Sequence, residues 1–248
     1  MNGGNFIRPL WPAPPAVQAA SSLRTGGVSK APFSSLNLGT HVEDDAGHVR
    51  ENRARLSATL GLEAEPLWLD QVHGTTVIEA QHYQPRIQAD ACVTTAAGQT
   101  CVVMTADCLP VLFCSQDGST VAAAHAGWRG LAAGVLEAVV ERMRISADDL
   151  LVWMGPAIGP AAFEVGDEVR EAFCKRQPAD CAAFARNPKG RWQANLYELA
   201  RSRLNEMGVT AVYGGDFCTY AEPARFFSHR RDGRTGRMAT MIWRLDEG

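Results

Sequence analysis

The 248-residue chain lacks a charge excess of either sign, since 24 basic residues nearly balance 27 acidic ones and the formal net charge is −3. It also lacks internal repeats, low-complexity tracts and breaks in composition. A balanced surface of this kind gives no indication of nucleic acid or a membrane as partner, and it suits the binding of a small molecule. We therefore expect one domain that spans residues 1–248.

An apolar targeting segment is also absent from the N-terminus, because Arg8 interrupts the apolar residues there and several prolines follow. Such a segment is neither a signal-peptide core nor a membrane span, so we expect a cytoplasmic protein. The prolines at positions 9, 12, 14 and 15 forbid regular helix. Residues 1–20 are expected to form an extended leader that covers the edge of a sheet.

The seven cysteines include no CxxC pair, and their number is odd. A chain of this length does not need disulfides for stability, and the expected state of these cysteines is therefore the reduced thiol. Zinc-finger and HExxH spacings are absent as well. Any metal site must then combine ligands that are far apart in the sequence.

The stretch from Cys101 to Gly130 carries the candidate chemistry. It reads as strand, turn, strand and a glycine-bracketed entry into a helix. Cys108 follows the apolar run 101–106, His125 follows the run 120–124, and His73 stands at the end of another predicted strand, 66–72. Two histidines and a cysteine with an open fourth position are typical of catalytic zinc, which would activate water or polarise a substrate oxygen.

Two alternatives use the same side chains. In a metal-free enzyme, Cys108 would be a nucleophile and His125 its base. In a copper protein the same set would form a blue-copper site, although no methionine is placed convincingly as its axial ligand. The residues by themselves leave these alternatives open.

A helix is predicted over residues 46–60, with Asp44 or Asp45 as its N-cap and Gly61 as its stop. Its apolar stripe consists of Val49, Leu56 and Leu60, and the position that completes the stripe is Arg53. The arginine either extends to solvent or pairs with an acid, or else it reaches a polar ligand.

A second helix is predicted to begin at the AGWRG sequence and to continue through Met143. Its N-terminus, with Arg129 adjacent, would favour an anion, unless the glycines form only a tight strand-to-helix turn. Further strands are predicted over 75–80, 90–95, 150–154 and 209–213, and further helices over 167–175 and 196–207. Residues 226–243 read as a β-hairpin with its turn at Asp232 and Gly233, and residues 180–191 as irregular.

Several long motifs in order give the chain a family resemblance. They are RTGGVS with PFSSLNLGTHV, then QVHG, TADCLPVLF, HAGWRG, GPAIGPAAFEVG and FFSHRRDGRTGRMA. Together they resemble the laccase-domain, or YfiH-type, family of polyphenol oxidase and purine nucleoside phosphorylase proteins. The match runs over nearly the whole chain and shows no departure at the key positions.

The resemblance implies an α+β fold, a four-layer α/β/β/α sandwich with mixed sheets in a single domain. It implies a zinc site of His73, Cys108 and His125, which would also be the catalytic residues, and nucleoside contacts from Asn37 and Arg53. The implied reactions are phosphorolysis of adenosine, inosine, guanosine and 5′-methylthioadenosine, and deamination of adenosine, with purine nucleosides and phosphate as partners. Phosphate would be held by Arg129, Arg53 and Arg24.

The family also suggests other activities. Older descriptions treat its members as copper laccases, and some bacterial relatives are linked to the editing of peptidoglycan precursors. A toxin class of similar fold uses a Cys–His pair for deamidation. Phosphorolysis is the expected main activity, because the predicted anion site directly follows His125.

Overall fold

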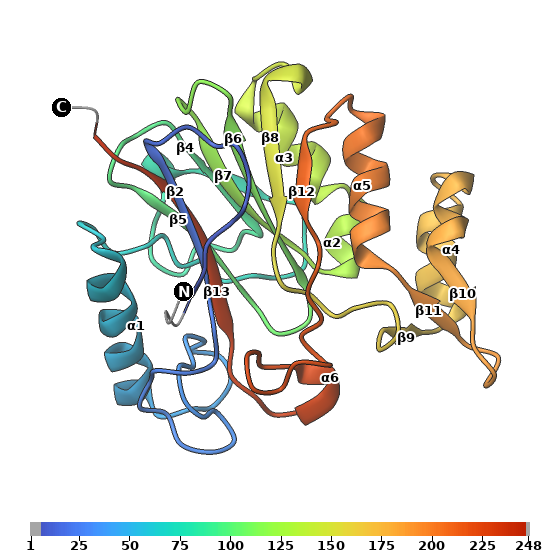
Figure 1. Cartoon of the computed structure of the whole chain (residues 1–248), viewed down its shortest axis with the longest axis horizontal. Helices are drawn as coiled ribbons and strands as arrows, with labels where there is room; N and C mark the ends of the chain where they lie inside the picture. Colours follow the sequence, from blue (N-terminus) through green and yellow to red (C-terminus); the bar gives the residue numbers. More distant parts are fainter. Residues whose placement is uncertain (1–5, 247–248) are drawn as a thin grey trace.

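A computed structural model describes residues 6–246 of the chain (Figure 1). Two β-sheets lie face to face at its centre. The first has four antiparallel strands in the order β1 (Phe6–Ile7), β2 (Val17–Ser22), β13 (Met238–Arg244) and β5 (Thr100–Thr105). The second is mixed, with parallel pairs at both edges, in the order β12 (Val212–Gly214), β8 (Leu150–Met154), β6 (Leu109–Ser115), β7 (Val121–Ala126), β4 (Ala91–Thr94) and β3 (Val77–Glu79).

Successive side chains of a strand point to opposite faces of its sheet, so each strand contributes buried residues to two different layers. In β5, Cys101 and Val103 face the second sheet, whereas Val102 and Met104 face α1 (Ala46–Leu60). In β6, Leu112 points towards the first sheet, and its neighbours point to the other face. That other face is covered by α2 (Trp128–Ala133), α3 (Val135–Met143) and α5 (Leu196–Glu206). The order of layers is therefore helix, sheet, sheet, helices, which confirms the expected α+β sandwich.

Smaller elements complete the chain. A three-stranded sheet in the order β10 (Phe184–Arg186), β11 (Trp192–Ala194) and β9 (Glu164–Val165) lies with α4 (Asp167–Cys174) to one side of α5 (Figure 1). The remaining helices are short: α6 (His229–Asp232) and the 3-10 turns η1 (Ala80–His82), η2 (Ala147–Asp149) and η3 (Pro178–Ala183). No helix in residues 6–246 is both long and apolar enough to cross a bilayer.

The first predicted helix has the expected bounds and caps. The Asp45 side chain accepts hydrogen bonds from the backbone N–H groups of Gly47 and His48, and Gly61 ends α1 in the left-handed conformation. The second predicted helix is wrong in one respect, because it is interrupted at Gly134. There φ is +106°, which separates α2 from α3.

The predicted C-terminal hairpin is wrong. Residues 229–232 form α6, and only β13 is a strand. β13 lies between β2 and β5, so its hydrogen-bond partners are distant in the sequence. The residues that looked like a hairpin turn instead form a helical turn capped by Ser228, whose side chain accepts from the backbone N–H of Arg231.

Other boundaries also differ. Within the leader, β1 forms an edge as expected, but β2 is interior to its sheet; residues 1–5 lie outside the described part. The predicted strand over residues 66–72 is reduced to isolated bridges at Leu67 and Asp70. The segment 180–191, predicted as irregular, contains the end of η3 and the whole of β10.

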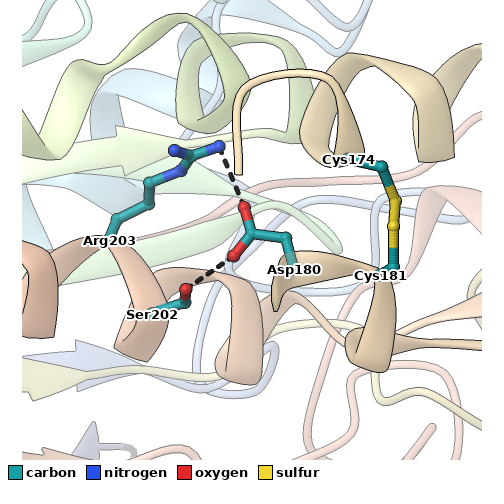
Figure 2. Close-up of a disulfide and its surroundings, with 5 residues drawn as sticks. All are labelled: Cys174, Asp180, Cys181, Ser202 and Arg203. Atoms are coloured by element: carbon teal, nitrogen blue, oxygen red, sulfur yellow. Dashed lines mark hydrogen bonds and ion pairs between the residues drawn. A yellow bond between two sulfur atoms is a disulfide. The ribbon is translucent and has the colours of Figure 1, made fainter. Parts of the chain in front are cut away.

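The expectation that all cysteines are reduced is wrong for one pair. Cys174 at the end of α4 and Cys181 in η3 form a disulfide, with their Cα atoms 5.3 Å apart (Figure 2). Beside it, the buried guanidinium of Arg203 pairs with Asp180 at 3.0 Å, and Ser202 donates a hydrogen bond to the same carboxylate (Figure 2). The meeting of α4 with η3 creates this pairing, which the spacing of the cysteines did not indicate.

A candidate metal centre and its adjoining cavity

Three side chains from separate segments meet at the end of the sandwich where the chain crosses from the first sheet to the second. Cys108 lies in the turn between β5 and β6, and His125 is near the end of β7. His73 lies in a bend that precedes β3. Their ligand atoms all lie within 4.8 Å of one another. The structure thus brings together the three residues that the sequence singled out.

The three ligands differ in exposure. His125 is 3% exposed, Cys108 is half-buried, and His73 is open to solvent. Cys108 Sγ lies 3.9 Å from His73 Nε2, and the two imidazole rings meet edge-on with centroids 4.8 Å apart. The cluster is therefore anchored on the buried side and accessible on the other, as a site for a small substrate requires.

Gly127 leaves space for this cluster. A Cβ at that position would lie 2.9 Å from His73 Cδ2, 3.1 Å from Cys108 Sγ and 3.5 Å from His125 Nε2. Any larger residue would displace the ligands, so glycine at the entry to α2 has a steric role here.

Asp90 is a part of the site that sequence reasoning missed. Its buried carboxylate lies 2.8 Å from His125 Nδ1 and accepts hydrogen bonds from the backbone N–H groups of Val72, His73 and Gly74. It thereby holds both the ring of His125 and the turn that carries His73. Such a carboxylate–histidine pair sets the tautomer and directs Nε2 towards a metal or a thiol. The only available signal was an acidic residue at the start of a buried strand.

The backbone at the cluster is also constrained. His73 and Asp107 both have positive φ angles, of 60° and 98°, which non-glycine residues seldom adopt. The Asp107 carboxylate does not join the cluster. It accepts hydrogen bonds from Thr219 Oγ1 and from the backbone N–H of Arg230 instead. These bonds hold the turn that presents Cys108.

The electrostatics of Cys108 and His125 are coupled. Burial alone would raise the pKa of Cys108, but the charge and hydrogen bond of His125, with a contribution from His73, lower it to about 6. Burial would lower the pKa of His125, whereas the charge of Cys108 and the hydrogen bond to Asp90 raise it to about 9. Burial would also raise the pKa of Asp90, but its hydrogen bonds from His125 and Gly74 lower it overall. Without a metal, the pair is thus biased towards thiolate and imidazolium.

A cavity of about 880 Å³ lies next to the segment that leads into His73, and its lining includes none of the three cluster residues. Its lining includes Val72, which directly precedes His73, and also His41, Trp68 and Tyr83. Burial lowers the pKa of His41, and the positive charge of Arg237 lowers it further, with smaller contributions from Arg53 and His125.

Arg53 lines this cavity. Its Nε and Nη2 atoms donate hydrogen bonds to the carbonyl of Leu38, and its guanidinium lies 3.8 Å from the ring centroid of Trp68. Burial lowers the pKa of Arg53 to about 10. The charged position in the apolar stripe of α1 therefore belongs to the wall of a cavity.

The other predicted binding residues lie elsewhere. Asn37 is fully buried, and its side chain is occupied by hydrogen bonds within the protein. Arg129 is exposed and stacks on its neighbour Trp128, with 4.5 Å between guanidinium and ring centroid. Arg24 donates to the carbonyls of Ser34 and Pro223.

An α+β sandwich with a His–Cys–His set at its crossover end defines a protein with a candidate mononuclear metal centre beside a ligand-sized cavity. The chain belongs to the multi-copper polyphenol oxidoreductase laccase family, whose model matches residues 18–245.

Its relatives are described mainly as nucleoside phosphorylases. It is 56% identical to a purine nucleoside phosphorylase of Pseudomonas aeruginosa, over 97% of this chain and 99% of that one. It is 53% identical to the purine nucleoside phosphorylase YfiH of Escherichia coli, over 96% and 98% of the two chains. A crystal structure of a Neisseria meningitidis protein, 47% identical, superimposes with a TM-score of 0.95 over 98% of this chain and 100% of that one.

Proposed function

We propose that this protein is a purine nucleoside phosphorylase that cleaves adenosine, inosine, guanosine and 5′-methylthioadenosine with phosphate, and that it also deaminates adenosine. The observation that carries the proposal is the position of the His73, Cys108 and His125 cluster next to a cavity walled by Arg53 and aromatic rings. The names of the relatives support the phosphorylase activity. Nucleosides and phosphate are cytoplasmic metabolites, so the proposal includes a cytoplasmic location.

Zinc is the proposed metal. Two imidazole nitrogens and one thiolate are ligands that zinc prefers, and the three ligand atoms lie within 4.8 Å of one another, close enough to share one ion. A zinc ion held by these three side chains would keep one coordination position open. It would act as a Lewis acid that lowers the pKa of a water molecule or polarises a substrate oxygen. The chain's own contribution is to hold the ligands in place: Asp90 holds His125 and the His73 turn, and Asp107 holds the Cys108 turn.

The proposed reactions make different demands on the site. In phosphorolysis a phosphate oxygen bonds to C1′ while the C1′–N9 bond breaks, and the electron pair of that bond leaves with the purine, which takes up a proton. In deamination, water adds at C6 and ammonia leaves. Phosphorolysis therefore needs a bound anion as well as a nucleoside, and cationic groups near the cavity suit that need.

The test is a chromatographic assay of adenosine with and without phosphate, together with metal analysis of the purified protein. Phosphorylase activity yields adenine and ribose 1-phosphate only when phosphate is present. Deaminase activity yields inosine at a rate that phosphate does not change. Equal rates of adenine formation with and without phosphate would rule out phosphorolysis.

A metal-free Cys–His hydrolase is the second candidate, favoured by the arrangement of Cys108, His125 and Asp90. These three residues have the order of nucleophile, base and orienting carboxylate that covalent catalysis uses. Full activity of protein freed of metal by a chelator would support it. Oxidation of phenols that requires copper loading would instead support the copper oxidase activity in the family's description.

A further inference from the structure

Arg237 is a cationic residue beside the cluster that neither the sequence motifs nor the family resemblance assigned a role. It directly precedes β13, whose first residue, Met238, pairs with Thr105, the last residue of β5. The turn that carries Cys108 leaves β5 at this point. Burial lowers the pKa of Arg237, whereas the charges of Cys108 and Asp107 raise it, so the guanidinium lies in the field of the Cys108 turn.

The half-buried guanidinium of Arg237 has an open edge. Nη1 donates to the carbonyls of Thr235 and Gly236, at 3.0 Å each. Within residues 6–246, no carboxylate lies within ion-pair distance of it, and Nε and Nη2 have no hydrogen-bond acceptor among those residues. These two N–H groups form one side of the guanidinium, the geometry that binds two oxygens of a phosphate or carboxylate.

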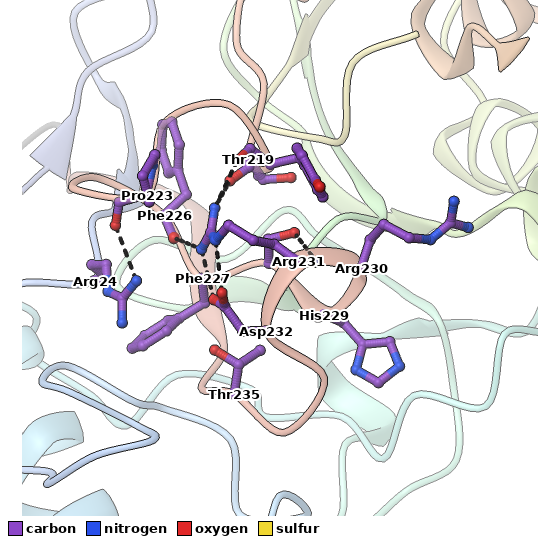
Figure 3. A network of polar contacts seen from close by, with 12 residues as sticks. Arg24, Thr219, Pro223, Phe226, Phe227, His229, Arg230, Arg231, Asp232 and Thr235 are labelled. Carbon is purple, nitrogen blue, oxygen red and sulfur yellow. Dashed lines mark hydrogen bonds and ion pairs between the residues drawn. The ribbon is translucent and has the colours of Figure 1, made fainter. Parts of the chain in front are cut away.

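The neighbouring arginines are already engaged. Figure 3 shows Arg231 turned inward to the carbonyls of Thr219 and Phe226, and it also pairs with Asp232. Arg230 points away from this network (Figure 3). Its Nη1 donates to the carbonyl of Glu164. Arg234 pairs with Glu43 at 3.3 Å. The charges of Arg231 and Arg234 are therefore paired with carboxylates, whereas Arg237, like Arg230, donates only to backbone carbonyls.

Arg237 is held in place by the motif that contains Asn37. Asn37 Oδ1 accepts a hydrogen bond from the backbone N–H of Arg237 at 2.9 Å, and Leu38 N donates to the Arg237 carbonyl at 3.2 Å. Gly39 makes room for the side chain, since a Cβ there would lie 2.8 Å from Arg237 Cγ. The buried amide of Asn37 thus fixes the backbone of Arg237.

We propose that Arg237 binds the phosphate co-substrate of the phosphorolysis proposed above, on which this inference rests. The open edge of the guanidinium supplies two hydrogen bonds and a positive charge to phosphate next to the cluster. Arg129 is a weaker candidate, because it is exposed and lies on a helix of only six residues.

The experiment compares phosphate and nucleoside saturation in four variants: Arg237→Gln, Arg237→Lys, Arg129→Ala and, as a matched control, Arg234→Gln. We expect Arg237→Gln to raise the KM for phosphate by about tenfold or more, because two charge-assisted hydrogen bonds are lost, while the KM for adenosine changes by less than about threefold. Arg237→Lys should lie between Arg237→Gln and wild type, since it keeps the charge without the paired donors. The control should behave as wild type.

Calorimetric titration of the metal-loaded proteins with inorganic phosphate separates this inference from the proposed function. Weaker phosphate binding by Arg237→Gln than by wild type, at unchanged metal content, supports the role of Arg237. Equal phosphate binding by the two proteins, or a larger effect from Arg129→Ala, overturns it. Absence of adenine from the wild-type reaction overturns the proposed function instead.

Discussion

Asp90 Oδ1 lies 2.8 Å from His125 Nδ1 in a part of the protein where both side chains are almost completely buried. The carboxylate accepts a hydrogen bond from Nδ1–H, and this bond directs Nε2 of the ring towards the cluster. This single contact links the core of the second sheet to the proposed chemistry.

We expect Asp90→Asn to weaken zinc binding by about 10- to 100-fold, because a neutral amide orients the His125 ring less firmly and makes it a poorer ligand. Competition with a chelator of known affinity measures this effect. Asp117→Asn is the matched control, since Asp117 lies in a turn where it accepts from Ser115 and Ser119. Unchanged zinc affinity in Asp90→Asn would show that the carboxylate has only a structural role.

Cys108→Ser should lose zinc and activity together, while the far-ultraviolet circular dichroism remains that of wild type. Zinc is lost because a serine hydroxyl is a poor zinc ligand. The fold is kept because the hydroxyl is nearly the same size as the thiol. Cys218→Ser, which alters a half-buried thiol outside the cluster, should retain both zinc and activity. A Cys108→Ser protein with its full zinc content contradicts the proposed site, and loss of the fold would make the site structural.

Arg53→Ala should raise the KM for nucleoside and reduce stability only modestly. The variant loses the stacking on Trp68 and the hydrogen bonds to Leu38, worth together about 1–2 kcal/mol. The control is Arg55→Ala on the same helix, where the arginine is exposed and pairs with Glu51. Steady-state kinetics and thermal unfolding of both variants provide the comparison. Nucleoside kinetics identical to wild type in Arg53→Ala would exclude a ligand contact.

The reactivity of Cys108 in metal-free protein should depend on pH in a distinctive way. Its pKa is lowered from 9.0 to about 6, so the thiolate is the main form above about pH 6 and is lost as the pH falls through that value. Iodoacetamide labelling followed by peptide mass spectrometry should therefore show a midpoint near pH 6. Cys114 is an internal comparison, because it is buried and burial raises its pKa to about 12. A Cys108 midpoint near pH 9 would disprove the coupling to His125.

Local features of the sequence determined several elements on their own. The cap Asp45 and the stop Gly61 bracket α1, because their effects involve only residues within one helical turn. The apolar runs predicted β5 and β7, and they marked Cys108 and His125 as polar residues next to such runs. They did not predict β6, which lies where only a turn was expected. Arg53 was recognisable as a charge within an apolar stripe.

Only the tertiary structure decided which of these residues meet. Asp90 and His125 are 35 positions apart, and Asn37 and Arg237 are 200 apart, so no local pattern indicates either contact. The same is true of β13, which pairs with β2 and β5 instead of folding back as a hairpin, and of the bond between Cys174 and Cys181. Strand register and helix packing are set by the burial of apolar side chains from the whole chain, and they position the polar groups of the site as a consequence.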